Sequence, residues 1–255
     1  MSDSTPVRYR LRGSAAWITL ASPETRNALS TELVAGLGAR LRDAMDDPAV
    51  RSVVLTGEGR AFCAGANLKG GGRMGETSKG NPFVDILKAM RHGPKPVIVA
   101  ANGHAFGGGI GLVAAADIAL AADTAIFSFS EVRIGAIPAM ISVAVLPKLG
   151  EHQTMRLFLT GERFDAAKAK EYGLLHRVTK PDELETAVQQ EIDAIAQGGP
   201  NAIREAKQLV RKVATLSEDE GFAWTERKIA EIFASEEAAE GMAAFREKRP
   251  PKWVK

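Results

Sequence analysis

Two features of the sequence could take part in chemistry: a cluster of glycines and an isolated acid that follows it. The glycines are Gly107, Gly108, Gly109 and Gly111, and the acid is Glu131. Backbone N–H groups at the start of a helix have no partner within the helix, so they can hold an anion or a developing oxyanion. A carboxyl group between an apolar strand and a turn can serve as a general acid and base. The pair favours a site where an oxyanion forms and a proton moves.

Each feature also has a purely structural explanation. The glycines could serve only to let a helix pack closely against a strand, and Glu131 could form an ion pair with Arg133 or with another base. A second stretch, residues 59–68, also follows a strand and is rich in small residues. Two such turns could supply one N–H group each to a two-donor oxyanion hole. The residues alone leave these interpretations open.

Other kinds of site are excluded by spacing or composition. The glycines form G-x-G-x-G, which is not the spacing of a dinucleotide fingerprint, and neither a Walker A sequence nor G-x-S-x-G occurs. No two of the four histidines lie at i and i+4, so we expect no metal site, and we interpret His104 as a surface or structural residue. The single cysteine, Cys63, excludes a disulfide within the chain.

The composition is that of an ordinary globular protein. The chain has 255 residues, 45% of them hydrophobic, and a net charge of only +2, which gives no argument for a nucleic-acid partner. No apolar run is long enough for a membrane span, and the N-terminal residues lack the apolar region of a signal peptide. We therefore expect a cytoplasmic protein.

The elements that must position these residues alternate between strand and helix up to about residue 180, which favours an α/β architecture. A hairpin is predicted over 7–21 with its turn near Gly13 and Ser14, and a helix is predicted to follow an N-cap at Ser30. Further strands are predicted at 50–57, 97–103, 117–123 and 125–130, and a helix at 107–116. Glycine, serine, lysine and proline make 70–82 a mobile loop by composition, and its position also allows a lid over an active site.

From Pro181 the pattern is helical. Apolar residues recur at helical spacing over 181–197, 200–214 and 217–233, and Gly198-Gly199-Pro200 separates the first helix from the second. This divides the chain into a core, residues 1–197, and a C-terminal helical region, residues 198–255. Such a region could fold back on the core or pack against another subunit.

Five stretches together resemble the enoyl-CoA hydratase/isomerase (crotonase) family. They lie in family order between about residue 17 and residue 253 and are SPETRNALS, VVLTGEGRAFCAGANL, KPVIVAANGHAFGGGIGLVAAADIALAADTAIFSFSEVRIGAIPA, LFLTGERFDAAKAKEYGLLHRV and EGMAAFREKRPPKW. The resemblance implies an α/β spiral of ββα turns with a C-terminal helical region that supports trimerisation. It also implies an acyl-CoA substrate whose coenzyme A is part of the substrate, no separate cofactor, and a homotrimer or a dimer of trimers.

The resemblance assigns roles to individual residues. The backbone N–H groups of Ala66 and Gly108 would form the oxyanion hole and stabilise the thioester enolate. Substrate and coenzyme A would be bound by Arg26, Ala64, Ala66, Leu68, Gly108, Phe245 and Lys248. The last two match a contact that is often made across a subunit boundary.

The sequence departs from the family pattern at two places. Hydratases of the family usually carry a glutamate two residues after the third glycine, and that position is Gly111 here. The usual PGAGGTQRL is altered to PAMISVAVL, residues 138–146. Glu131 would then be the only general acid and base. The pair of altered motifs is also similar to bacterial hydratases with relatives that act on methylglutaconyl-CoA.

These departures leave three alternatives for the activity. A hydratase-like lyase is the first expectation, a Δ3,Δ2-enoyl-CoA isomerase is the second because it needs only one carboxyl group, and an acyl-CoA binding protein without catalysis is the third. A water, a bicarbonate ion or a carboxylate of the substrate could fill the space left at Gly111.

Overall fold

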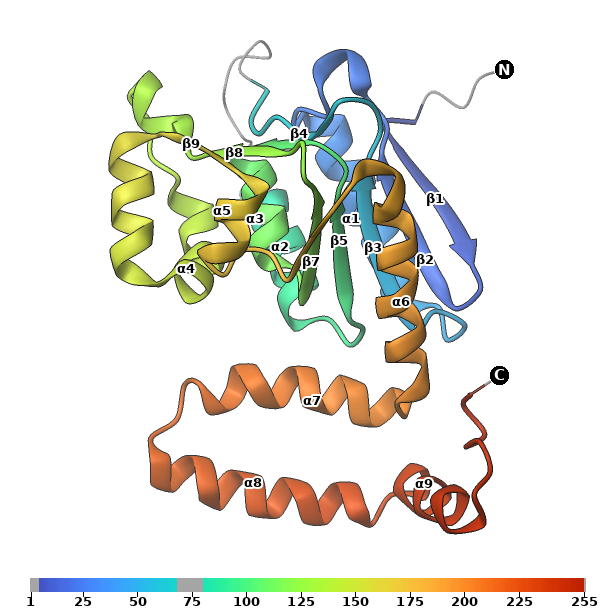
Figure 1. The fold of residues 1–255 in the computed structure, drawn as a ribbon. Coiled ribbons are helices and arrows are strands. Elements are labelled where there is room, and N and C mark those ends of the chain that lie inside the picture. Colours follow the sequence, from blue (N-terminus) through green and yellow to red (C-terminus); the bar gives the residue numbers. More distant parts are fainter. Residues whose placement is uncertain (1–4, 68–79, 255) are drawn as a thin grey trace.

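Two mixed β-sheets and the helices around them form the core of the chain (Figure 1). The computed structural model describes residues 5–67 and 80–254. The larger sheet has the strand order β1 (Val7–Arg12), β2 (Ala15–Leu20), β3 (Ser52–Gly57), β5 (Val97–Ala101), β7 (Ile118–Ala122) and β10 (Arg177–Thr179). The smaller sheet has the order β4 (Ala61–Cys63), β6 (His104–Phe106), β8 (Ile126–Ser128) and β9 (Arg163–Asp165).

Nine α-helices lie in the described residues. They are α1 (Thr31–Asp46), α2 (Pro82–His92), α3 (Gly108–Ala115), α4 (Ala139–Thr160), α5 (Ala166–Glu171), α6 (Leu184–Gln197), α7 (Pro200–Val213), α8 (Glu218–Phe233) and α9 (Glu236–Glu247). Three short 3-10 helices, Pro23–Thr25, Ser130–Ile134 and Pro181–Glu183, join other elements. None of the helices in the part of the chain that is described is long and apolar enough to cross a membrane.

The local predictions near the N-terminus are confirmed. Strands β1 and β2 pair antiparallel around a two-residue turn, where Gly13 has a φ of +57°. Helix α1 starts after Ser30, whose side chain accepts a hydrogen bond from the N–H of Leu33. That bond satisfies one of the unpaired donors of the first turn, which is why serine marks the start of this helix.

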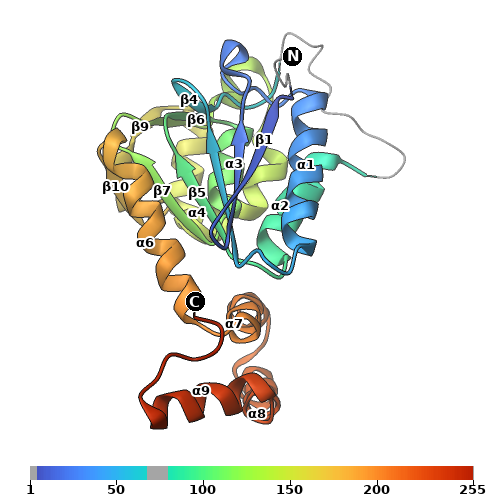
Figure 2. The same ribbon diagram turned by 90° about the vertical axis from the view of Figure 1, so that its right-hand side faces the viewer.

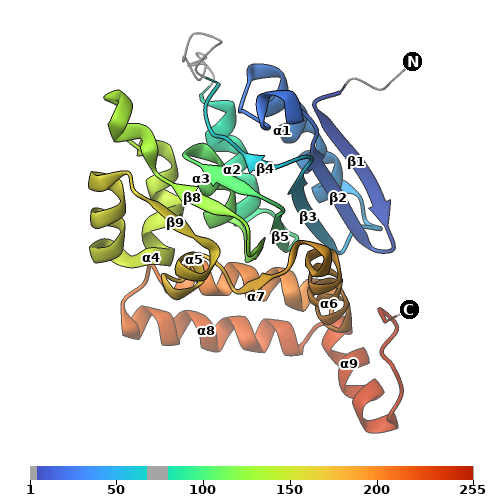
Figure 3. The same ribbon diagram turned by 45° about the horizontal axis from the view of Figure 1, so that its top comes forward.

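The chain repeats a unit in which a strand of the larger sheet, a strand of the smaller sheet and a helix follow one another. The units are β3–β4–α2, β5–β6–α3 and β7–β8–α4. The expected succession of ββα turns is therefore present. Helix α3 packs between α2 and α4 and contacts β4 and β6 (Figure 3).

The larger sheet is covered on both faces. Alternate residues of its strands, such as Trp17, Val54 and Ile98, pack against α6 on one face. Their neighbours in the sequence, such as Ile18 and Leu55, belong to the main core with α1, α2, α3 and α4 (Figure 2). This period of two is the pattern of a strand buried on both sides.

Of the smaller sheet, the sequence predicted β8, within the strand expected over 125–130, and missed β4, β6 and β9. The strand predicted over 97–103 ends at Ala101, and β6 (His104–Phe106) separates it from the glycines. Strands β4 and β9 are also only three residues long. Three residues are too few to show the alternation of apolar and polar side chains that marks a strand. The hydrogen-bond partners of these segments also come from distant parts of the chain, so neighbouring residues do not indicate them.

The C-terminal helices are predicted correctly and are held to the core by charged contacts. Lys207 Nζ on α7 lies 2.7 Å from Asp117 Oδ2 and donates to the carbonyl oxygens of Met90 and Lys95, both at 2.8 Å. Arg211 also pairs with Asp117, at 2.9 Å. Residue Asp117 precedes β7, so one acid links α7 to the larger sheet.

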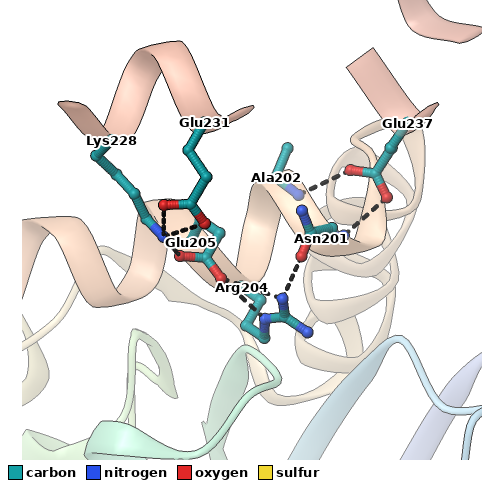
Figure 4. A network of polar contacts seen from close by, with 7 residues as sticks. All are labelled: Asn201, Ala202, Arg204, Glu205, Lys228, Glu231 and Glu237. Carbon is teal, nitrogen blue, oxygen red and sulfur yellow. Dashed lines mark hydrogen bonds and ion pairs between the residues drawn. The ribbon is translucent and has the colours of Figure 1, made fainter. Parts of the chain in front are cut away.

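Helices α7, α8 and α9 are linked to one another by the contacts in Figure 4. Lys228 on α8 pairs with Glu205 on α7 at 2.7 Å. Glu237 on α9 accepts hydrogen bonds from the N–H groups of Asn201 and Ala202, at 2.9 and 2.8 Å. An acid at the first turn of α7 satisfies its free donors and suits the helix dipole. The three helices are thus joined by polar contacts, and the boundary at 197/198 remains a prediction.

Candidate active site

The first glycine-containing turn follows β4 and includes Ala64, Gly65 and Ala66. Gly65 has a φ of +84°, and a Cβ added there would lie 2.7 Å from the carbonyl oxygen of Phe106 and 3.4 Å from the backbone nitrogen of Gly108. Only glycine allows this turn to come so close to the second one. The carbonyl of Gly65 accepts a hydrogen bond from the N–H of Leu29, at 2.8 Å, which fixes the turn against the start of α1.

The second turn joins β6 to α3. Gly107, with φ +48° and ψ −117°, is the N-cap of α3, and its N–H donates to the carbonyl of Ser128 at 3.1 Å. A Cβ on Gly108 would lie 2.5 Å from Leu29 Cδ1, and one on Gly109 would lie 2.3 Å from the carbonyl oxygen of Cys63. The packing explanation of the glycines is therefore correct: α3 approaches its neighbours too closely for any side chain.

The close packing of α3 does not supply hydrogen-bond acceptors to all of the N–H groups at its start. Among the described residues, no acceptor is recorded for the backbone N–H of Gly108 or for that of Ala66. The N–H of Ala64, by contrast, donates to the carbonyl of Arg26 at 3.0 Å. Within residues 5–67 and 80–254, the two groups that the resemblance assigns as oxyanion donors therefore have no acceptor, and they lie on turns that touch each other.

Glu131 lies on the 3-10 helix Ser130–Ile134, directly after β8. A Cβ added to Gly107 would lie only 2.9 Å from Glu131 Oε1, so the carboxylate rests against the backbone of the second turn. Oε2 is buried and has no hydrogen-bond partner in the described structure. Burial raises the pKa of Glu131, and a hydrogen bond from its own backbone N–H opposes this in part. The carboxyl group is half-buried, lies next to the glycine turn and has no ion-pair partner among the described residues.

The ion-pair explanation of Glu131 finds no support in the described residues. Arg133 donates to the carbonyl of Thr160, at 3.5 Å, and no ion pair of Glu131 is recorded. A partly desolvated carboxyl group without an ion-pair partner is typical of an acid–base residue.

The space beside Gly111 is filled by hydrocarbon. A Cβ added to Gly111 would lie 2.2 Å from Ile141 Cγ2 and 2.9 Å from Ile141 Cβ. Ile141 is on the first turn of α4 and only 3% exposed. Of the groups that could fill this space, neither a water nor a bicarbonate ion nor a substrate carboxylate can take the position of a Cβ on Gly111, because Ile141 of α4 already occupies it.

Asn27 is a structural residue that the sequence reasoning missed. It is fully buried with a φ of +54°; its Oδ1 accepts from the N–H of Ser22 at 2.8 Å, and its Nδ2 donates to the carbonyls of Glu58 and Ala61 at 3.0 and 2.9 Å. These bonds tie the turn that carries Arg26 to the loop before β4. The sequence signal that could have identified Asn27 is the ability of asparagine to adopt left-handed backbone angles.

The sequence reasoning also missed Leu29 and Phe83, whose side chains flank Gly108. The position of a Cβ on Gly108 is 3.5 Å from Phe83 Cζ, in addition to the contact with Leu29. Both side chains are buried. Apolar residues just before or just after an N-cap look like ordinary core positions in a sequence, so no local signal distinguished them.

The remaining predicted residues are not all brought together. Phe245 and Lys248 belong to α9 and its C-cap, at the opposite end of the molecule from β4 (Figures 1 and 2), and Phe245 is 86% exposed. One chain alone therefore does not place them at the site. Leu68 and most of the 70–82 loop lie outside the described residues.

His104 has a structural position. Its Nδ1 accepts a hydrogen bond from the N–H of Ile126 at 3.2 Å, and its ring stacks on Phe106. In the described parts of the chain, no three His, Cys, Asp or Glu side chains gather as ligands for a metal ion.

Comparison with known proteins finds relatives along nearly the whole chain. Residues 10–255 match the family model described as enoyl-CoA hydratase/isomerase. A putative enoyl-CoA hydratase of Thermus thermophilus is 35% identical, with 95% of this chain and 98% of that protein covered. A carnitinyl-CoA dehydratase of Proteus mirabilis is 34% identical, with 98% of both chains covered.

A solved structure shows the same fold. The crystal structure of an enoyl-CoA hydratase from Shewanella pealeana superposes with a TM-score of 0.92 at 32% sequence identity, covering 97% of this chain and 96% of that one. The expected crotonase fold, with two mixed sheets and C-terminal helices, is confirmed. The chain belongs to the enoyl-CoA hydratase/isomerase family of enzymes.

Proposed function

We propose that this enzyme hydrates an enoyl-CoA thioester and dehydrates the product, with Glu131 as its one general acid and base. The observation that carries the proposal is the contact between Glu131 and Gly107. The carboxylate thus contacts the residue that precedes Gly108, whose N–H has no acceptor among the described residues. The printed names of relatives, two of which are given above as a hydratase and a dehydratase, support the same reaction.

The proposed role of the two turns is to hold the thioester oxygen. The N–H groups of Ala66 and Gly108 would donate to it, and charge on that oxygen grows as the enolate forms. Fixed donors stabilise such charge without having to reorganise, and removing one typically costs about 3–4 kcal/mol in the transition state. Leu29 and Phe83 flank Gly108 and would exclude water from this contact.

In the proposed reaction the oxygen of water bonds to C3, and C2 of the enolate receives a proton. Glu131 would accept the proton that water loses and supply the proton that C2 gains. Burial raises the pKa of Glu131, so its protonated form persists to higher pH than that of an ordinary glutamate. This suits a group that must donate as well as accept.

Isomerisation of a 3-enoyl-CoA is a second candidate, and the Ile141 side chain beside Gly111 favours it. One proton would leave C2, and one would return at C4 from the same carboxyl group, with no water consumed. A hydrocarbon wall does not hinder this transfer. Binding of acyl-CoA without catalysis, the third alternative, loses support because the chain belongs to an enzyme family and keeps an unpaired carboxylate at the glycine turn.

Coenzyme A is proposed to bind along the backbone near Arg26, Ala64, Ala66 and Leu68, and to reach Phe245 and Lys248 of a second subunit. The distance of α9 from the glycine turns in one chain supports a contribution from another copy (Figure 1). A homotrimer or a dimer of trimers is therefore proposed. The cytoplasmic location remains a prediction.

The proposal is tested by separate incubations with a 2-enoyl-CoA and a 3-enoyl-CoA of the same chain length. We expect a 3-hydroxyacyl-CoA from the first substrate, and we expect its formation to fall by at least about a hundredfold in Glu131→Gln. Interconversion of the two enoyl esters without any hydroxyacyl product would replace the hydratase with the isomerase. If neither ester is converted, the proposed function is wrong.

A further inference from the structure

We propose that Gly111 and Ile141 form a matched pair that determines how the site divides its substrate between water addition and proton transfer at carbon. The pair decides whether a second acid, and the water that it would hold, has room beside Glu131. This inference rests on the proposed function, because it takes Glu131 as the group that works on an enoyl-CoA.

Glu131 and Ile141 contact the same helix, one turn apart. The N–H of Gly111 donates to the carbonyl of Gly107, the N-cap, at 3.2 Å, so the two glycines are one turn apart at the start of α3. Glu131 Oε1 lies 2.9 Å from where a Cβ on Gly107 would be, and Ile141 Cγ2 lies 2.2 Å from where a Cβ on Gly111 would be. One helical turn is about 5.4 Å, so the two backbone positions that Glu131 and Ile141 contact are close neighbours.

Ile141 cannot simply rotate to admit a larger residue at 111. The two atoms in the way are Cγ2 and Cβ, at 2.2 and 2.9 Å from the added Cβ. Rotation about χ1 can move Cγ2, but Cβ is fixed by the backbone of α4, and the side chain is buried. Of the natural residues at 141, only glycine removes both atoms.

The two departures from the family pattern are thereby explained as one. Where the family motif reads PGAGG, this chain reads PAMIS, and position 141 is the fourth residue, a glycine in the motif. An acid at 111 requires glycine at 141, and isoleucine at 141 requires glycine at 111. A side chain at both positions would clash, whereas glycine at both positions would leave an open space.

The lack of room for a second acid affects hydration and isomerisation differently. Water addition breaks an O–H bond of water, forms the C3–O bond and adds a proton to C2, so one carboxyl group must serve two atoms. Transfer of a proton from C2 to C4 needs a single group that moves between two carbons. Filling the second position with hydrocarbon slows the first reaction relative to the second.

The test is an exchange of the pair. In Gly111→Glu/Ile141→Gly the new carboxylate has room, and we expect the ratio of 2-enoyl-CoA hydration to 3-enoyl-CoA isomerisation to rise by about tenfold or more. The matched control Gly111→Gln/Ile141→Gly has the same shape without the acid, and its ratio should not rise. A ratio that is equal in the two exchange variants overturns the inference.

A second measurement decides the matter should the exchange variant fail to fold. Ile141→Gly alone opens the space beside Gly111, and a small carboxylate such as formate can enter it. We expect formate to increase hydration by this variant and not by the wild type, where Ile141 fills the space. Absence of any effect of formate on a folded Ile141→Gly variant contradicts the inference.

Failure of the inference can be told apart from failure of the proposed function. If the wild type converts neither ester, the proposed function fails before any variant is compared. If the wild type is active and depends on Glu131, but the ratio does not respond to the exchange, only the role of the Gly111–Ile141 pair is wrong.

Discussion

The carboxylate of Glu131 lies against the backbone of Gly107, so close that a Cβ on this glycine would be 2.9 Å from Oε1. The next residue, Gly108, has a free N–H at the start of a buried helix. The proposed proton-transfer group therefore contacts the residue that precedes the proposed oxyanion donor. The predictions below follow from this contact and from the elements that maintain it.

The first prediction concerns the stability of Glu131→Gln. Burial raises the pKa of Glu131 above its ordinary value of 4.5, so the group favours folding when protonated. That contribution is complete below the pKa of the unfolded chain and is lost as pH rises through the folded pKa. The variant should therefore melt at a higher temperature than the wild type at about pH 8, and the difference should shrink towards about pH 4.

Thermal unfolding at these two pH values provides the check, with Glu226→Gln, an exposed acid on α8, as the control. The control should show no such pH-dependent gain. A Glu131→Gln variant that is destabilised equally at both pH values would show that the carboxylate has a stabilising partner.

The second prediction concerns Gly107→Ala. A residue with a side chain at φ +48° and ψ −117° is strained by about 1–3 kcal/mol, and here the new methyl group also meets Glu131 Oε1. Both stability and turnover should fall. In Gly135→Ala, where φ is +73° and nothing lies within 4 Å of the added Cβ, only stability should fall. Equal turnover in the two variants would show that Gly107 does not contribute to the active site.

The third prediction concerns Asn27→Ala. The change removes three side-chain hydrogen bonds and leaves buried backbone groups unpaired, at a cost of about 1–3 kcal/mol for each such group. The turn that carries Arg26 should shift, and we expect KM for the thioester to rise more than kcat falls. Asn102→Ala serves as the control, because it removes bonds to Gly57 and Gly59 in the neighbouring loop. An unchanged KM in Asn27→Ala would contradict the expectation.

The fourth prediction concerns the attachment of α7. Asp117→Ala leaves Lys207 and Arg211 without their acid in a largely buried site, and breaking such a pair typically costs about 3–5 kcal/mol. Hydrogen exchange should accelerate in α7 before it does so in α1. Glu231→Ala removes an exposed pair with Lys228 and should change stability by no more than about 1 kcal/mol. Unchanged exchange in α7 would mean that other contacts hold it.

Signals that act over a few residues were readable from the sequence. Ser30 as an N-cap, the turn at Gly13 and the break at Gly198 each depend on the local backbone, and the structure confirms them. The position of Glu131 after an apolar strand was also a local observation. Its closeness to Gly107 was not, because β6 and β8 bring the two segments together through the smaller sheet.

The contents of the site could not be predicted in the same way. Gly111 and Ile141 are thirty positions apart, and only the packing of α3 on α4 shows that one fills the space of the other. From the sequence alone, the missing side chain at 111 indicates a void. Asn27 likewise looks like a loop residue until its three partners are known.

The most direct test of the central claim is deuterium incorporation at C2 of an acyl-CoA thioester in D₂O. The account predicts that the wild type exchanges the C2 proton, seen as a mass increase, and that Glu131→Gln exchanges it at least about a hundredfold more slowly while still binding the thioester. Exchange at the wild-type rate by Glu131→Gln would contradict the assignment of Glu131 as the group that moves the proton.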